Sequence, residues 1–101
     1  MSIPDFDRLA LNATADVVAF ARFVAQTEFL FDGASDAQAL AQYRTAWFDA
    51  EILNALALER WDEAGRSADW GAVWRADFAH DAAQTVAALQ ALVALHFKPA
   101  K

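Results

Sequence analysis

Apolar residues recur at steps of three, four or seven along three long segments of this 101-residue chain. This spacing is typical of one face of an α-helix, whereas a half-buried strand would alternate at every second residue. We predict helices over residues 3–31, 36–64 and 69–97, each roughly 40 Å long. The stripes that we expect to form the core are Phe6, Leu9, Ala13, Val17, Phe20, Val24 and Phe31 in the first helix; Leu40, Tyr43, Trp47, Ala50, Asn54, Leu58 and Trp61 in the second; and Trp70, Trp74, Phe78, Ala82, Thr85, Leu89, Leu92 and His96 in the third.

Helix-ending residues separate these segments. Asp32-Gly33 and Gly65 provide the glycine that commonly takes the left-handed conformation after a helix, and Lys98-Pro99 ends the third segment. Within the first segment, Asn12-Ala13-Thr14 can interrupt the helix, because Thr14 is a possible N-cap. Short turns between long helices make the neighbouring helices antiparallel. We therefore predict an all-α, up-down-up antiparallel three-helix bundle, with residues 1–101 forming a single domain.

Helix-starting residues precede each segment. Ser2 with Asp5, and Ser35 with a glutamine three residues later, have the spacing of a capping box. In that motif the two side chains pair with backbone N–H groups of the first helical turn. Ser67 or Asp69 can cap the third helix in a similar way.

The first two helices carry more apolar residues than one core needs. The residues that lie off the core stripes are Leu11, Val18, Phe29, Phe48, Ile52 and Leu56. A helix that is apolar nearly all round is buried on more than one side, and a large exposed apolar patch usually marks an interface. Scattered Ala and Leu on a surface are ordinary, but aromatic and β-branched residues at these positions favour an interface. We expect a homodimer, since twofold self-association is the commonest oligomeric state.

Three tryptophans gather around the second turn. We expect Trp61, Trp70 and Trp74 to lie together at that end of the bundle, near Phe6. We interpret the cluster as a plug for the open end of a thin bundle. The alternative is a binding pocket or a hot spot for a partner protein, where tryptophan is enriched.

Polar residues inside the stripes raise a second possibility. Folding the helices back at their turns brings Asp16, Glu51 and Asp81, on the stripes or their margins, to about the same height. The residues within one turn of them are Asn54, Asp77 and His80. Carboxylates and a histidine that converge from several helices can bind Mg²⁺, Mn²⁺ or iron. Asp77 and His80 share one helical face, but diiron bundles use two such motifs with Glu. We expect solvated flank residues instead, with Asn54 and Asp81 pairing across the core.

Composition and charge exclude several functional classes. The net charge of −6 repels phosphate backbones and the arginines are dispersed, so we expect no nucleic-acid partner. The absence of Cys excludes disulfide scaffolds and thiolate sites. The longest uncharged run, residues 82–97, is too short and too polar for a membrane span. The first residues are acidic where a secretory signal is basic, so we expect a cytoplasmic protein.

No arrangement of nucleophile and base stands out. Ser2, Ser35 and Ser67 lie at expected helix caps, and the three glycines do not form a phosphate-binding loop. We therefore expect a protein that is not an enzyme and carries no cofactor. The sequence favours a homodimeric protein–protein interaction module of adaptor, antitoxin or immunity type, because an acidic helical surface can complement a basic target. The alternative function is a bundle that binds a metal or small ligand through the carboxylate and histidine cluster.

Overall fold

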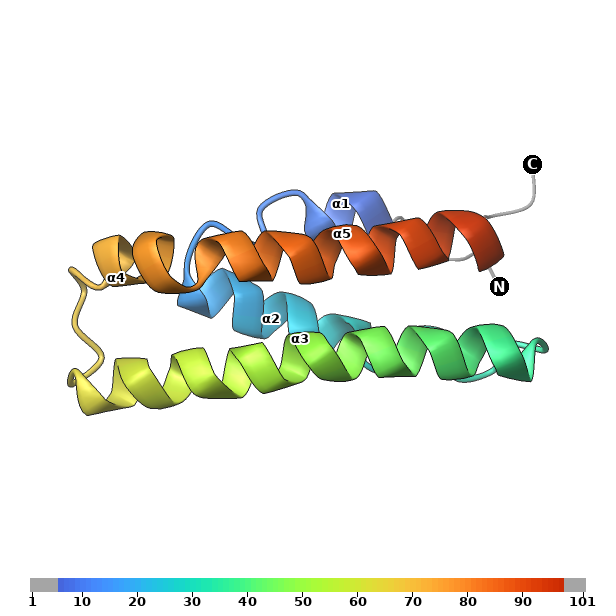
Figure 1. The fold of residues 1–101 in the computed structure, drawn as a ribbon, viewed down its shortest axis with the longest axis horizontal. Helices are drawn as coiled ribbons and strands as arrows, with labels where there is room; N and C mark the ends of the chain where they lie inside the picture. The colour runs from blue at the N-terminus through green and yellow to red at the C-terminus, as the bar shows by residue number, and fades with distance from the viewer. Residues whose placement is uncertain (1–5, 98–101) are drawn as a thin grey trace.

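The computed structural model describes residues 6–97, and every regular element in that range is an α-helix. The helices are α1 (Phe6–Ala10), α2 (Val17–Thr27), α3 (Ala37–Glu63), α4 (Gly71–Asp77) and α5 (Ala79–His96), shown in Figure 1. The prediction of an all-α fold is therefore confirmed for these residues. The predicted cap at Ser2, the helix start at residue 3 and the stop at Lys98-Pro99 lie outside them.

The prediction of three helices that run up, down and up is wrong for the first segment. In Figure 1 the chain reverses between α1 and α2, so the predicted helix over residues 3–31 is a helical hairpin. The side-chain amide of Gln90 donates to the Asp7 carboxylate at 2.9 Å, which attaches α1 to α5. Beyond α2, the Phe31 ring stacks on Phe97 with centroids 4.1 Å apart. Four segments therefore alternate in direction: α1, α2, α3 and the α4–α5 pair.

Asp16 starts the second arm of this hairpin. Its backbone is extended and its carboxylate accepts a hydrogen bond from the Ala19 backbone N–H at 2.7 Å, as an N-cap does. The interruption allowed by Asn12-Ala13-Thr14 is present, but Asp16 rather than Thr14 is the cap. The reversal brings the Phe6 ring edge-on to Phe23 at 5.5 Å. Phe23 is therefore buried, although it lies off the predicted stripe.

The turn between α2 and α3 differs from the prediction in two ways. Helix α2 ends at Thr27, and Gly33, several residues later, does not have a positive φ, so it does not take the expected left-handed position. Helix α3 begins after Asp36, whose carboxylate accepts from the Ala39 N–H at 3.0 Å. Asp36 therefore replaces the predicted capping box at Ser35, one residue earlier.

The end of α3 confirms the expected role of Gly65. This glycine has φ 74°, and its N–H donates to the Asp62 carbonyl at 3.0 Å. The N–H of Arg66 donates to the Trp61 carbonyl at 2.9 Å. Together these bonds form a Schellman motif, which satisfies carbonyls that the helix itself leaves unpaired.

The third predicted helix is interrupted once. Phe78, with φ −129° and ψ −34°, separates α4 from α5. Its N–H still donates to the Trp74 carbonyl at 2.9 Å, and its carbonyl accepts from the Ala82 N–H at 2.9 Å. The interruption is therefore a kink in an almost continuous helix. No side chain caps α4, and the predicted cap Ser67 instead accepts from the Asp69 N–H within the preceding turn.

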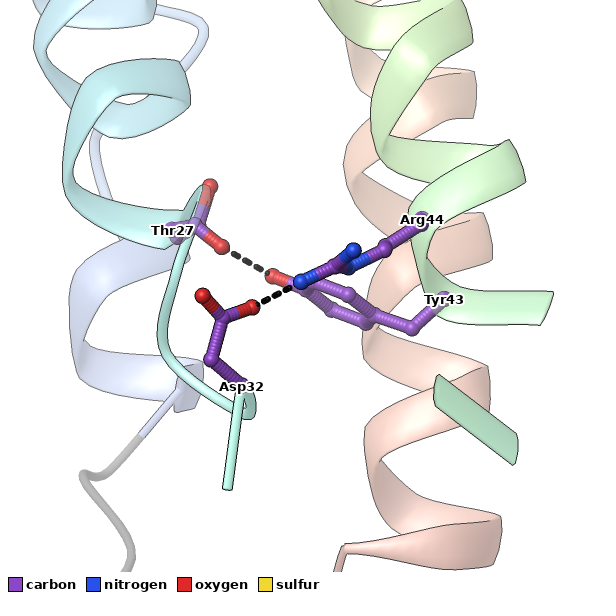
Figure 2. Close-up of polar contacts among 4 residues, drawn as sticks. All are labelled: Thr27, Asp32, Tyr43 and Arg44. Atoms are coloured by element: carbon purple, nitrogen blue, oxygen red, sulfur yellow. Dashed lines mark hydrogen bonds and ion pairs between the residues drawn. The ribbon is translucent and has the colours of Figure 1, made fainter. Parts of the chain in front are cut away.

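Helix α3 packs against both α2 and α5. The Tyr43 hydroxyl donates to the Thr27 carbonyl at 2.7 Å, and the Trp47 indole N–H donates to the Val24 carbonyl at 3.0 Å. Figure 2 shows the Tyr43 bond beside the exposed ion pair between Arg44 and Asp32. Burial raises the pKa of Tyr43 to about 12, because the ionised form loses its hydration.

The predicted stripes account for most of the large buried side chains. Residues that are buried without having been predicted are Phe23, Thr27, Ala39, Ala57, Val86, Val93 and Phe97. His96 was predicted to lie in the core and is exposed, with its Nε2 3.1 Å from Oε1 of Gln42. Several predicted core residues are only half-buried: Leu9, Leu40, Leu58, Trp61, Thr85 and Leu92.

Asn54 is buried in α3 without the predicted partner. Its side-chain oxygen has no hydrogen-bond partner among residues 6–97, and Asp81 is exposed. We expect Asn54→Leu to raise the free energy of unfolding by about 1 kcal/mol, because it removes a buried acceptor that is not satisfied. Urea denaturation followed by circular dichroism measures this change. Asn54→Asp is the control and should destabilise the fold, since it buries a charge. A loss of stability in the leucine variant would contradict the prediction.

Candidate interaction surface

All six residues predicted to form an interface have large, exposed apolar side chains. They are Leu11, Val18, Phe29, Phe48, Ile52 and Leu56. Three lie on α3, and three lie on α2 or the turns on either side of it. Leu95, near the end of α5, is similarly exposed and was not predicted. The predicted exposure of these side chains is therefore confirmed, while their role as an interface remains a prediction.

Phe48, Ile52 and Leu56 form a continuous line along α3, which we call the outer stripe. Residues four apart on a helix lie on the same side. Their exposed fractions are 59%, 50% and 51%, so each presents about half of its surface to solvent. Ile52 is two residues, or about 200° of helical rotation, from the buried Asn54. The outer stripe therefore lies opposite the side of α3 that packs in the core.

Smaller residues extend the outer stripe at regular intervals. Two residues before Phe48 and one after Ile52 continue the row at steps of four, three, four and three. The full series is Ala41, Thr45, Phe48, Ile52 and Ala55. This is the heptad spacing of helices that pack in a coiled coil. The Thr45 hydroxyl donates to the Ala41 carbonyl at 3.0 Å, so its hydrogen-bond donor is used within the helix. The outer side of α3 thus carries a second seam with coiled-coil spacing.

Charged residues border the outer stripe. Asp49 is exposed beside Phe48, and Glu59 follows Ala55 at the next step of four. Arg60, one residue further, donates to the Asp77 carboxylate of α4 at 2.9 Å. An apolar centre with a charged rim is the usual arrangement of a protein–protein interface.

The predicted metal-binding residues do not come together. Asp16 caps α2, Asp77 pairs with Arg60, and His80 and Asp81 are exposed at the start of α5. Glu51 is half-buried on α3. Among residues 6–97, no three His, Asp or Glu side chains are grouped so that they could hold a metal ion. The structure therefore offers no support for the alternative function of metal binding.

The three tryptophans gather at one end of the fold, as predicted, but without Phe6, which packs against Phe23. Trp70 and Trp74 are buried, consistent with a plug. A pocket of about 330 Å³ also opens there, and Trp61, Trp70 and Trp74 line it together with the start of α2. The burial of Trp70 and Trp74 fits the interpretation as a plug, and binding at the pocket remains a prediction.

Two further findings bear on function. None of the helices between residues 6 and 97 combines the length and apolar character that a membrane crossing needs. No protein-family model, curated protein or solved structure matches this chain.

Proposed function

We propose that this protein is a protein–protein interaction module that forms a homodimer through the outer stripe of α3. The observation that carries the proposal is the position of Phe48, Ile52 and Leu56, about half-exposed and opposite the packed side of the same helix. Large apolar side chains in a continuous row favour association, because contact removes them from water. Val18 and Phe29, exposed on and after α2, are available to a further protein partner of the adaptor, antitoxin or immunity type.

An antiparallel pairing of two α3 helices suits the charges at the ends of the stripe. In a parallel twofold dimer each residue on the seam would face its own copy, so Glu59 would meet Glu59. An antiparallel pair avoids that repulsion and also opposes the two helix dipoles. In the antiparallel pair, the Glu59 end of one α3 helix lies near the Ala41 end of the α3 helix of the second copy. Both ends of the dimer would then be alike, as twofold symmetry requires.

Ile52→Asp should dissociate the dimer, because it places a charge without a partner at the centre of the interface. Sedimentation equilibrium at micromolar concentration should give twice the 11.1 kDa chain mass for the unmodified protein. The variant should sediment as a monomer, with a dimer dissociation constant raised about 100-fold or more. The circular dichroism spectrum of the variant should still be that of a helical protein, since Ile52 is not part of the core.

Leu95→Asp is the matched control. Leu95 is 73% exposed on α5, a different helix from the one that carries the outer stripe, so the same change of chemistry should leave the dimer intact. A monomeric unmodified protein would overturn the proposed homodimer. A variant at Ile52 that remains a dimer would show that another surface forms the contact.

A further inference from the structure

The pocket beside the tryptophans combines apolar walls with a charged side chain. Its volume, about 330 Å³, falls at the lower end of the range of roughly 300 to 1,000 Å³ that small-molecule sites occupy. The pocket lies between the first turn of α2 and the segment that joins α3 to α4. The residues that concern its chemistry are Asp16, Val17, Trp61, Trp70, Gly71 and Arg75. A flat aromatic molecule would match the indole walls in size and character.

Arg75 provides the positive charge. Its side chain is exposed and makes no hydrogen bond or ion pair within residues 6–97. The guanidinium lies close to Gly71. A Cβ atom at that position would be only 3.3 Å from Nη1 of Arg75. The absence of a side chain at Gly71 thus leaves room for the guanidinium at the pocket wall. A guanidinium prefers a planar carboxylate, to which it can donate two parallel hydrogen bonds.

Two other charged side chains, Asp16 in the pocket lining and Arg66 near it, already make contacts of their own. One oxygen of Asp16 accepts from the Ala19 N–H at 2.7 Å, where the helix dipole offsets its negative charge. The guanidinium of Arg66 lies 5.3 Å from the centre of the Trp61 ring, so that ring already has a cation over it. A ligand that carries an anion therefore suits the pocket better than one that carries a cation.

We propose that this pocket binds a small aromatic carboxylate. The carboxylate pairs with Arg75, and the ring lies against Trp61 and Trp70. The proposal does not depend on dimer formation, because these residues lie outside the outer stripe of α3. It assigns a ligand class to the tryptophan cluster in addition to the structural role of the buried Trp74.

Naphthoate is a suitable probe, and the indole N–H signals in heteronuclear NMR spectra give a local readout. The chain has four tryptophans. Addition of naphthoate should shift the signals of Trp61 and Trp70, while the Trp47 signal, from the α2–α3 contact, should stay in place. Naphthylmethylamine, which has the opposite charge, should leave all four signals unchanged at the same concentration.

Arg75→Gln should raise the dissociation constant for naphthoate about tenfold or more, because the ligand loses its charged partner. Arg22→Gln is the matched control, since it removes the same charge from an exposed arginine outside the pocket and should leave the affinity unchanged. Equal binding by the Arg75 variant, equal binding of the amine, or no shift at Trp61 and Trp70 would overturn the proposal.

Discussion

Trp74→Ala should lower the free energy of unfolding by about 3 to 5 kcal/mol, the range observed when a buried tryptophan is truncated. Trp74 is fully buried, and its ring lies 5.7 Å from Phe20 and 6.1 Å from Phe78 between centroids. Its indole N–H donates to the Thr14 carbonyl at 2.9 Å. One side chain therefore joins α4, α2 and the α1–α2 turn. Urea denaturation followed by circular dichroism measures the loss.

Trp74→Phe separates the two contributions of this side chain. Phenylalanine keeps an aromatic ring at the position but cannot donate to Thr14, so its cost should be smaller, about 1 to 2 kcal/mol. Trp61→Ala is a second control. Because Trp61 is only half-buried, this substitution should lower the free energy of unfolding by less than Trp74→Ala does. A Trp74→Ala variant as stable as the unmodified protein would show that the α4 end of the fold is not packed as described.

The free energy of unfolding should fall steeply between pH 10 and pH 12, because Tyr43 ionises in the unfolded chain at a lower pH than in the folded one. Its pKa is about 12 in the folded chain and about 10 in an unfolded one. A raised pKa means that the folded state holds the proton more tightly. The stability that results is complete below pH 10 and is lost as the pH rises to 12, by up to about 1.4 kcal/mol per pH unit.

Tyr43 is the only tyrosine in the chain, so tyrosinate absorbance reports this ionisation directly. Tyr43→Phe should lack this part of the alkaline loss. It should also cost about 1 kcal/mol near neutral pH, because the bond to the Thr27 carbonyl is missing. A tyrosinate titration centred at pH 10 in the folded protein would contradict the burial of this hydroxyl.

Local signals placed some elements almost correctly. The second helix, predicted over residues 36–64, is Ala37–Glu63. Asp36 at its start and Gly65 after its end form their bonds with backbone groups a few residues away. Such contacts are nearly independent of the rest of the fold, so periodicity and helix-ending residues place both ends within one residue, although the cap was predicted at Ser35. The cap at Asp16 is equally local, but Thr14 was named as the possible cap and Asp16 was considered only for the carboxylate cluster.

The faces of the helices were also predictable, whereas the clustering of polar residues was not. Helical rotation alone determines that Phe48 and Ile52 lie away from the core side of α3, and both are exposed. The proposed convergence of Asp16 with Asp81 depended on relative heights along straight helices. The reversal in the first segment and the kink at Phe78 change those heights, and the carboxylates do not gather.

The sequence by itself determined that the described chain is helical and which side chains of α3 face outward, because propensity, periodicity and capping act over a few residues. Only the tertiary structure decided that the first segment folds back on itself. One long helix and two short ones have similar local preferences, so contacts between distant residues choose between them. Phe6 meets Phe23 and Trp74 bonds to Thr14 only when the chain reverses. The tryptophan pocket, too, exists only because the start of α2 lies beside α4.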